Sequence, residues 1–510
     1  MAGSRFPENV RGEIIIGALP PIQEIMLAKL TQHAAAATDA ALRKHTHCLI
    51  VLPVSKDLSR AWPGSEVLAS LLARQRMKAG ALAKSTVTGN LKDGALASWI
   101  MFDPKKPAYE QQAALRGALQ PLLGENPAEI AIAVCGDAAQ RHAAAQVATY
   151  CAWVNGAVLP ERKRKASHKP LKEIHLYGTR DGDDFAELRA RAEGNILCRE
   201  LTMLPPNELT PGQYRARIKE LAKEHGWRRE EFDYSQLKKM GAGAFCAVAQ
   251  GSETRDAAIV HLSYTHSRAK RTAAVVGKGI CFDTGGHNLK PARYMYAMHE
   301  DMNGSAVALG IMVAATQMKL PVNLDCWLAI SRNDISPRAY HQNEVVRALN
   351  GTTIEVMHTD AEGRMVLADT LTLAARAKPD LIIDFATLTG TMHSALGERY
   401  SGIFATSDEL GAQAVAAGRL AGERVCVFPQ DDDYDSALDS KIADVKQCSL
   451  DAAADHILAT RFLKRFVGNT PWIHVDLSAS SAKGGLGAVA SDTTGFGVGW
   501  ALQLLAAQLN

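Results

Sequence analysis

Short apolar runs alternate with longer stretches of helical spacing along the whole chain. In the first third, runs typical of buried strands occur at 47–53, 95–102, 129–135 and 172–177. Alanine-rich stretches with helical spacing lie between them, near 110–123 and 138–155. Strands that alternate with helices of this length are typical of α/β domains. The pattern therefore predicts an α/β unit in the amino-terminal third.

A long helix is predicted to connect this unit to the rest of the chain. Residues 183–204 have helical spacing and end at Pro205-Pro206, which cannot continue a helix. We place the domain boundary near 177–182. Residues 1–178 are then a smaller amino-terminal α/β domain, expected to serve oligomerisation or regulation. Residues 179–510 form a larger domain.

The larger domain also alternates apolar runs with stretches of helical spacing, and glycines interrupt it more often. Strands are predicted at 257–264, 272–276, 322–330, 381–386, 402–406, 424–428 and 472–477. Helices are predicted at 305–318, 364–377, 409–420, 451–466 and 496–509. This pattern predicts a second α/β domain, with a mixed central sheet flanked by helices.

Composition narrows the class of protein. The chain is 47% hydrophobic and 22% charged, which suits a globular protein with a large core. The net charge of +3 gives no general case for binding nucleic acid or acidic membranes. One basic run, at 161–169, has the charge to contact phosphates, although a solvated loop is the favoured interpretation.

Cysteine usage and hydropathy indicate the compartment. The nine cysteines are scattered and form no CxxC pair, which argues against a disulfide framework or a thiolate zinc site. The amino terminus lacks the apolar core of a signal peptide. No stretch approaches the roughly 18 apolar residues of a membrane-spanning helix. We expect a cytoplasmic protein with no membrane partner.

Two segments place unusual polar residues beside predicted buried strands. After the strand that ends at Val276, a glycine-rich loop carries Lys278, Asp283 and Lys290, and Asp301 precedes the next helix. Glycine and aspartate are common in turns, and aspartate caps helices, so each residue taken singly has a simpler explanation.

The second segment, 357–369, carries Asp360, Glu362 and Arg364 at alternate positions. In an extended chain these three side chains would point to one side. An ion pair between Asp360 and Arg364 is the simpler alternative. Carboxylates that converge from both segments would repel each other unless cations neutralised them. Oxygen ligands without histidine or cysteine suit magnesium, manganese or zinc, and a pair of such ions can activate water.

Competing catalytic motifs are absent. His299-Glu300 begins like the zinc motif HExxH, but Asn303 stands where the second histidine is needed. No GxSxG elbow occurs in the chain. Gly277-Lys278-Gly279 lacks the spacing of a phosphate loop. Cys281 has no nucleophile motif around it, so we interpret it as a small buried residue.

At these residues the sequence resembles the leucyl aminopeptidase (cytosol aminopeptidase) family. The family signature NTDAEGR appears as HTDAEGR at 358–364, and the lysine–aspartate–lysine loop as GKGICFDTGGHNLK at 277–290. The resemblance continues at 201–211, 383–390 and 472–477. It covers about 190–510 well and the amino-terminal third only by architecture.

The resemblance implies a ligand set for two divalent metal ions, manganese or zinc and possibly magnesium. Asp283 and Glu362 would bridge the ions, and Asp360 would complete the tighter site. Lys278 and Asp301 would complete the more exchangeable site. Lysine binds a metal only as the neutral amine, so the ions would have to depress the pKa of Lys278.

The resemblance also implies a reaction. A water activated by the metals would attack the first peptide carbonyl of a peptide with a free amino terminus. Lys290 would stabilise the oxyanion, and Arg364 would hold a bicarbonate ion that acts as general base. Members of the family are typically hexamers, so a homohexamer is the expected assembly.

The implied pocket for the first side chain departs from the family pattern. Met298, Thr387, Leu388 and Gly390 match residues of that pocket. Ser478 and Ser481 stand where mammalian-type members carry alanine and methionine. His358 replaces the signature asparagine, and Thr284 a nearby serine. The smaller, more polar wall gives no basis for a strict leucine preference.

Three alternatives stay open. The first is a selective dipeptidase, such as a cysteinyl-glycine hydrolase. The second is an additional DNA-binding role through the basic run at 162–169. The third is a catalytically silent scaffold, against which the complete set of polar residues argues.

Overall fold

The computed structural model describes residues 26–451 and 453–508, so the segment in which no signal peptide was recognised lies outside the described part. A six-stranded sheet is built from the first third, in the order β1-β6-β5-β2-β4-β3. Only the β3–β4 pair of this sheet is antiparallel. Its strands are β1 (Lys29–His33), β2 (His47–Pro53), β3 (Val87–Asn90), β4 (Leu96–Phe102), β5 (Glu129–Val134) and β6 (Glu173–Tyr177).

Helices cover both faces of this sheet, which explains why β2 is an unbroken apolar run. Leu49 and Val51 face a core shared with α3 and α4. Cys48, Ile50 and Leu52 face the opposite core, under α1, α2 and η1. Alternate side chains of a strand point to opposite faces, so both must be apolar here. The bounds are α1 (Asp39–Leu42), α2 (Ser65–Gln75), η1 (Ala79–Ala83), α3 (Ala108–Leu123) and α4 (Ala138–Gly156).

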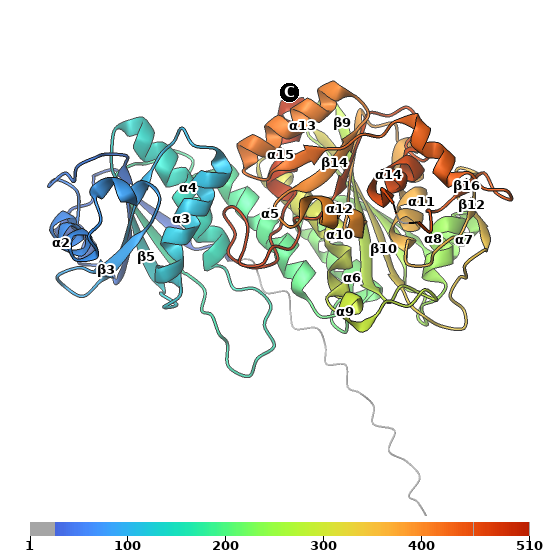
Figure 1. Ribbon diagram of the computed structural model, residues 1–510, viewed down its shortest axis with the longest axis horizontal. Coiled ribbons are helices and arrows are strands. Elements are labelled where there is room, and N and C mark those ends of the chain that lie inside the picture. Colours follow the sequence, from blue (N-terminus) through green and yellow to red (C-terminus); the bar gives the residue numbers. More distant parts are fainter. Residues whose placement is uncertain (1–25, 452, 509–510) are drawn as a thin grey trace, which may run out of the picture.

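A long helix, α5 (Ala186–Met203), follows the first sheet and runs beside the second (Figure 1). It packs on both α4 and α10 (Asn303–Gln317), so it contacts elements of both parts of the chain. The division at residue 178 stays a prediction.

The second sheet has eight strands in the order β15-β14-β17-β13-β9-β10-β8-β7 and is mixed. The pairs among β17, β13, β9 and β10 are parallel, whereas β7, β8 and β10 pair antiparallel, as do β14 and β17. Its strands are β7 (Arg228–Asp233), β8 (Ala258–Tyr264), β9 (Thr272–Asp283), β10 (Asn323–Asn333), β13 (Leu381–Ala386), β14 (Ser401–Ala405), β15 (Val425–Val427) and β17 (Trp472–Asp476). A small sheet joins β11 (Val345–Arg347), β12 (Thr353–Glu355) and β16 (Val445–Lys446).

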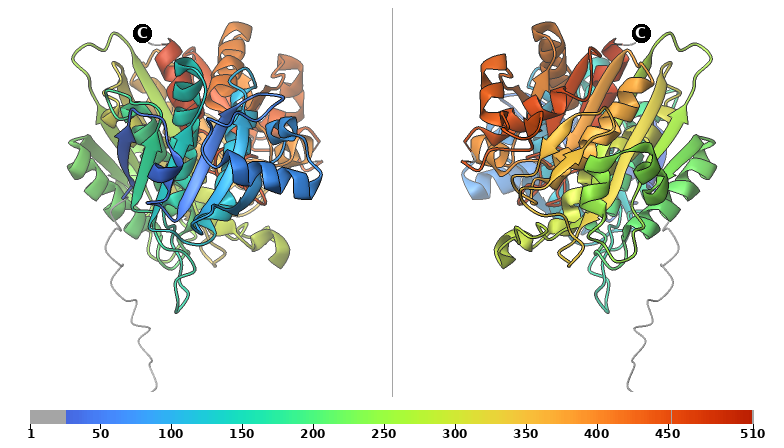
Figure 2. Two further views of the ribbon diagram at one scale, coloured as in Figure 1. Left: turned by 90° about the vertical axis from the view of Figure 1, so that its left-hand side faces the viewer. Right: turned by 90° about the vertical axis from the view of Figure 1, so that its right-hand side faces the viewer.

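Helices also lie against both faces of the eight-stranded sheet (Figure 2). One face packs on α5, α6 (Pro211–His225), α10, α13 (Asp408–Ala421) and α15 (Val498–Gln508). The other packs on α7 (Tyr234–Met240), α8 (Gly243–Ala249), α11 (Glu362–Arg376) and α14 (Asp455–Lys464). The shorter elements are α9 (Ala292–Met295), η2 (Met298–Met302), α12 (Gly390–Leu396) and η3 (Asp432–Leu438). The predicted α/β fold class is confirmed.

Two element boundaries differ from the prediction. Strand β9 does not end at Val276 but continues to Asp283. Its glycines are not loop residues, because a Cβ on Gly277 would lie 2.7 Å from the carbonyl oxygen of Gly304. They let the start of α10 pack directly on the strand.

Within the described residues, no helix is long and apolar enough to cross a membrane.

The second difference concerns the alternating segment. Glu362 is already the first residue of α11, so Asp360, Glu362 and Arg364 do not share one extended strand. Because Glu362 and Arg364 both lie in the first turn of this helix, their side chains point in different directions and contact different residues. The prediction that all three side chains point to one side is therefore wrong.

Candidate metal centre

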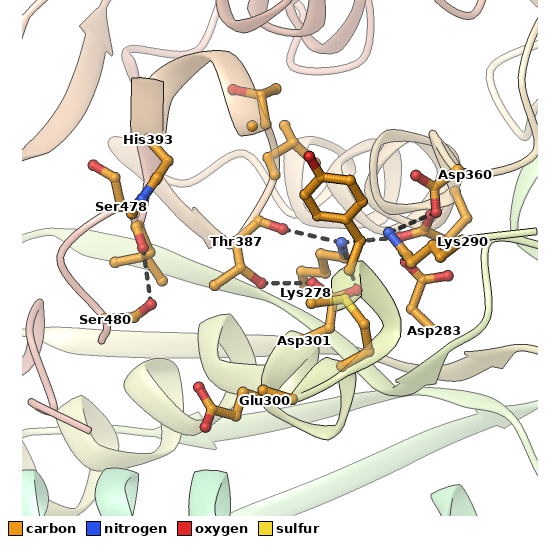
Figure 3. A pocket seen from close by; sticks show the side chains of 18 of the residues that line it. Lys278, Asp283, Lys290, Glu300, Asp301, Asp360, Thr387, His393, Ser478 and Ser480 are labelled. Carbon is orange, nitrogen blue, oxygen red and sulfur yellow. Dashed lines mark hydrogen bonds and ion pairs between the residues drawn. The ribbon is translucent and has the colours of Figure 1, made fainter. Parts of the chain in front are cut away.

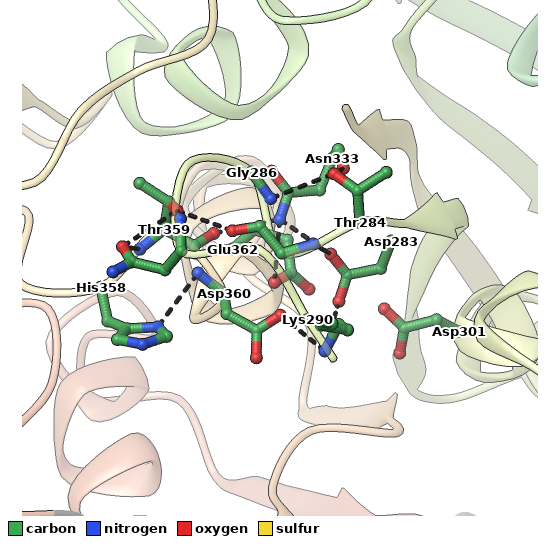
Figure 4. A network of polar contacts seen from close by, with 12 residues as sticks. Asp283, Thr284, Gly286, Lys290, Asp301, Asn333, His358, Thr359, Asp360 and Glu362 are labelled. Atoms are coloured by element: carbon green, nitrogen blue, oxygen red, sulfur yellow. Dashed lines mark hydrogen bonds and ion pairs between the residues drawn. The ribbon is translucent and has the colours of Figure 1, made fainter. Parts of the chain in front are cut away.

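Six of the seven predicted polar residues, all but Arg364, meet at the carboxyl ends of the central strands, where open α/β sheets hold their ligands. Lys278 and Asp283 lie on β9, and Asp301 lies in η2. Figure 4 shows Asp283 and Asp301 with Lys290, Asp360 and Glu362 around one centre. The structure thus brings together side chains from four separate segments.

Three buried carboxylates form the core of this centre. Asp283, Asp301 and Glu362 each offer an oxygen within 4.8 Å of the others, an arrangement that suits a metal ion. Burial makes the charged form of a carboxyl group costly unless cations are close by. The structure meets part of this demand with two lysines.

Each lysine joins two carboxylates. The Nζ of Lys278 lies 2.8 Å from Asp301 Oδ2 and 2.9 Å from Glu362 Oε1. The Nζ of Lys290 lies 2.9 Å from Asp283 Oδ2 and 2.6 Å from Asp360 Oδ1. Four carboxylates against two ammonium groups leave an excess of two negative charges. The donor set therefore fits additional cations.

The pKa shifts report the same shortage of positive charge. Burial raises the pKa of Asp301 to about 7, although Lys278 opposes the shift. Burial, then Glu362 and Asp283, raise the pKa of Asp360 to about 7. For Lys278, burial lowers the pKa, but Asp301 and Glu362 outweigh it and raise the pKa above the ordinary lysine value. Lys278 is thus held as a cation until other cations replace its charge.

A shell of neutral groups orients the carboxylates. Asn333 donates its Nδ2 to Asp283 Oδ1 at 2.8 Å and to the Thr359 carbonyl at 3.0 Å. The hydroxyl of Thr387 donates to Asp301 Oδ1 at 2.7 Å. Such outer contacts fix the direction in which a ligand presents its lone pairs. Asn333 was missed from the sequence, although a polar residue ending the buried strand β10 was a signal.

Thr359 and Asn288 lock the loop that carries Lys290 to the segment that carries Asp360. The backbone N–H of Thr359 donates to Asn288 Oδ1 at 2.9 Å, and the N–H of Asn288 donates to Thr359 Oγ1 at 2.8 Å. The turn that leads from β9 to Asn288 contains Gly285, whose φ of 87° is left-handed. Lys290 is positioned through this double contact.

Lys278 approaches α11 closely because position 363 is glycine. A Cβ on Gly363 would lie 2.7 Å from the Lys278 Nζ. The glycine thus leaves room for the amine beside Glu362. Its role is space rather than backbone conformation.

Arg364 does not reach the centre. Its guanidinium is buried, and Nη2 donates to both carboxylate oxygens of Asp455, at 2.9 and 2.8 Å. Its Nη1 donates to the Gln447 carbonyl at 3.2 Å. The bicarbonate ion expected at Arg364 therefore does not fit, because a carboxylate of the protein already takes the Nη2 group. Asp455 lies 91 residues downstream, so no local motif pointed to it.

A cavity of about 820 Å³ opens above the centre and is lined by all the candidate metal ligands and Lys290. The predicted pocket residues also line it, namely Met298, Thr387, Leu388, Gly390, Ser478 and Ser481. Figure 3 shows His393, Ser478 and Ser480 across the cavity from Lys290 and Asp360. Arg364 is not among its lining residues, within the described part of the chain.

The comparison with protein families decides the class. Residues 196–502 match the model of the cytosol aminopeptidase family, catalytic domain. The chain belongs to the cytosol aminopeptidase family. It is therefore a metal-dependent aminopeptidase and a hydrolase, and the resemblance noted in the sequence is confirmed.

Individual relatives agree with this assignment. The chain is 34% identical to a probable cytosol aminopeptidase of Afipia carboxidovorans, over 85% of each chain. It is 40% identical to a probable cytosol aminopeptidase of Acidovorax ebreus, over 66% of this chain and 68% of the relative. Among solved structures, the bottromycin maturation enzyme BotP in complex with Mn matches with a TM-score of 0.78 and 29% identity, covering 91% of this chain and 99% of that chain.

This aminopeptidase has a polar wall in its cavity that the sequence comparison had only partly indicated. Ser478 and Ser480 turn their hydroxyls to backbone carbonyls, those of Tyr400 at 2.7 Å and Leu477 at 2.9 Å. His393, Glu300 and Glu398 also line the cavity and were not predicted. Glu300 lies in η2, whereas His393 and Glu398 lie in and directly after α12, so two separate segments meet here only in the fold.

Proposed function

We propose that the chain removes the amino-terminal residue from peptides with two divalent metal ions. Lys278, Asp283, Asp301, Asp360 and Glu362 would hold the ions. The observation that carries this proposal is the excess of two negative charges in a centre that opens into the cavity. When bound, the ions would supply Lewis acidity and activate water.

The charge count favours two ions over one. The four positive charges of two divalent ions would balance the negative charges of all four carboxylates. The carboxylates would then no longer hold Lys278 in its protonated form. A neutral Lys278 amine is a competent ligand, whereas the ammonium group is not. Manganese and zinc are the metals of first choice, because the set combines carboxylates with one amine. The Mn in the complex of BotP supports manganese for the first trial.

Lys290 is the proposed stabiliser of the oxyanion. Its side chain lines the cavity beside Asp283 and Asp360, and those carboxylates hold it as a cation. A fixed positive charge where negative charge develops on a carbonyl oxygen is worth several kcal/mol in such sites. No step is assigned to bicarbonate, because the Asp455 carboxylate already accepts hydrogen bonds from the Arg364 Nη2 group.

The six pocket residues are proposed to receive the first side chain of the substrate. Met298 and Leu388 provide an apolar part, while Ser478 and Ser481 make the far wall small and polar. This wall favours small or polar first residues over leucine. It also favours the second candidate, a selective dipeptidase for substrates such as cysteinyl-glycine.

The remaining expectations about partners stay predictions. A homohexamer is expected from the resemblance to the family, and a cytoplasmic location is expected from the sequence. In the basic run, Arg162 pairs with Glu208 and Lys163 with Glu161, so part of its charge is already compensated. This pairing weakens the case for nucleic-acid binding.

The decisive experiment combines metal content with activity. The chelated protein is reloaded with Mn²⁺, Zn²⁺ or Mg²⁺ and assayed on aminoacyl-anilides and dipeptides. Glu362→Gln is expected to lose bound metal and activity together. Glu300→Gln is the matched control, because Glu300 lines the same cavity but lies outside the candidate ligand set. Equal metal content and activity in wild type and Glu362→Gln would refute the proposal.

A further inference from the structure

A second group of potential metal ligands lies in the six-stranded sheet, apart from the centre of the eight-stranded one. His45, Glu129 and His175 each offer one ligand atom, and these atoms all lie within 4.8 Å of one another. Neither the family match, which begins at residue 196, nor the proposed peptidase centre includes them. The group therefore needs its own explanation.

Strand register brings these residues together. On β6, Glu173, His175 and Tyr177 share one face, because alternate side chains point the same way. Glu129 begins β5 directly opposite Glu173. His45 precedes β2, which pairs with β5 on its other side. Two neighbouring parallel strands and the segment before a third thus bring their polar groups to one place.

Distances within the group are already close to those of a metal site. His45 Nδ1 lies 3.0 Å from Glu129 Oε1. His175 Nε2 lies 3.8 Å from Glu129 Oε2 and 3.8 Å from Glu173 Oε2. Ligand atoms around a tetrahedral zinc ion are about 3.3 Å apart, since zinc–nitrogen and zinc–oxygen bonds measure about 2.0–2.2 Å. Small side-chain rotations would bring the set to that spacing.

The second ring nitrogen of His45, Nε2, also has a close polar partner. His45 Nε2 lies 2.9 Å from the Tyr177 hydroxyl. When Nε2–H donates to that hydroxyl, Nδ1 carries a free lone pair aimed at Glu129. An outer hydrogen bond of this kind fixes the tautomer and the ring orientation of a ligand. His45 is thus oriented from the buried side of the site.

The histidine rings of this group lie close to one another. The His45 and His175 rings lie 4.6 Å apart between centroids, and His33 lies 5.8 Å from His175. Burial, then His175 and His45, lower the pKa of His33. The neutral imidazole ring is the form that binds metal.

We propose that His45, His175 and Glu129 bind one zinc ion, with the remaining position open to water. Two neutral imidazoles and a carboxylate are a known zinc ligand set. The site is reachable from solvent, because the Glu129 side chain is 40% exposed and the His175 side chain 17%. The ion would tie β5, β6 and the segment before β2 together.

The test counts zinc in the full-length protein. Wild type, Glu129→Gln and His175→Gln are saturated with zinc chloride and dialysed. Zinc is then measured per chain by mass spectrometry of the metal. His142→Gln is the matched control, because His142 lies on α4 outside the cluster. Wild type and the control are expected to retain one more zinc per chain than either cluster variant.

Peptidase activity separates this site from the other centre. Both cluster variants should keep wild-type activity when loaded with metal, because their residues lie outside the peptidase cavity. Cobalt(II) gives a second readout, as its visible absorption should fall in the cluster variants relative to the control. Equal zinc content in all four proteins, each folded by circular dichroism, would overturn the proposal. Neither zinc count nor cobalt spectrum depends on whether the protein hydrolyses peptides.

Discussion

Replacing Asp455 with alanine tests the assignment of Arg364 most directly. The substitution removes both oxygens that receive the Arg364 Nη2 donor, at 2.9 and 2.8 Å. The guanidinium keeps its charge, since arginine does not deprotonate in proteins. Its side chain is only 2% exposed, and the Gln447 carbonyl still accepts from Nη1 at 3.2 Å. Because a buried charge needs compensation, we expect both a loss of stability and a new anion site.

The magnitude follows from the burial of the pair. Removing one partner of a buried ion pair costs about 3–5 kcal/mol. The Asp455 side chain is 22% exposed, so water will reach part of the vacated space and the cost belongs at the lower end. We expect about 3 kcal/mol, a factor of roughly a hundred in the unfolding equilibrium constant. Asn at 455 keeps acceptor oxygen without the charge and should lose less.

The vacated position should bind a small carboxylate. An anion that binds only the folded state adds about 2.7 kcal/mol when its concentration is a hundred times its Kd. Bicarbonate or formate should therefore restore most of the stability of Asp455→Ala and leave wild type unchanged. The measurement is urea unfolding, followed by tryptophan fluorescence, with and without the anion in carbonate-free buffer.

Two results would refute the reasoning. One is an Asp455→Ala protein within about 0.5 kcal/mol of wild type, the range of ordinary surface substitutions. The other is a wild-type protein whose stability or peptidase activity rises with bicarbonate. That second result would mean that bicarbonate displaces Asp455 from Arg364.

Three further predictions concern the metal centre and the cavity. Gly363→Ala should weaken Mn²⁺ binding at least tenfold in a titration, because its Cβ would displace the Lys278 amine, 2.7 Å away. The raised pKa values of Asp301 and Asp360, both about 7, should destabilise the metal-free protein as pH rises from about 4 to about 7. Between these pH values the unfolded state loses the two protons while the folded state still holds them, which is why stability falls. Because metal ions bind the deprotonated carboxylates, added Mn²⁺ should stabilise the protein more at pH 8 than at pH 5 in urea unfolding. Ser481→Met should raise kcat/KM for leucyl over alanyl substrates by about tenfold, since each added apolar contact is worth about 1–3 kcal/mol.

Each of these predictions has a clear contrary result. Gly390→Ala is the control for Gly363→Ala, because a Cβ at 390 meets open space in the same cavity. Equal Mn²⁺ affinity in the two variants would contradict the steric argument. A metal-free protein that gains stability between pH 4 and 7 would contradict the raised pKa values. An unchanged substrate ratio in Ser481→Met would place Ser481 outside the pocket.

Much of the fold was predictable because its elements are buried on both faces. Strand β2 and strand β13 were predicted with the same bounds that the structure has. The errors occurred at residues whose type or spacing is compatible with more than one kind of secondary structure. Glycine in β9 was taken as loop, although it makes room for α10. The alternation at Asp360 and Glu362 was taken as extended, although α11 begins there.

The candidate ligands were identified from two short segments, but not their supports. Asn333, Thr387 and Asp455 contact the predicted residues from distant parts of the chain. No local pattern indicates such a contact, because hydrogen bonds of this kind depend on which strands and helices become neighbours. Thr387 had been assigned to the pocket only, and it also holds Asp301.

By itself, the sequence determined the alternation of strands and helices, the family and the residue types at the metal centre. These properties follow from local periodicity and from a contiguous motif, which need no knowledge of neighbours in space. Only the tertiary structure decided that Arg364 binds Asp455 and that His45 meets His175. The order and register of the strands set both contacts, because charges far apart in the chain interact only when packing makes them neighbours.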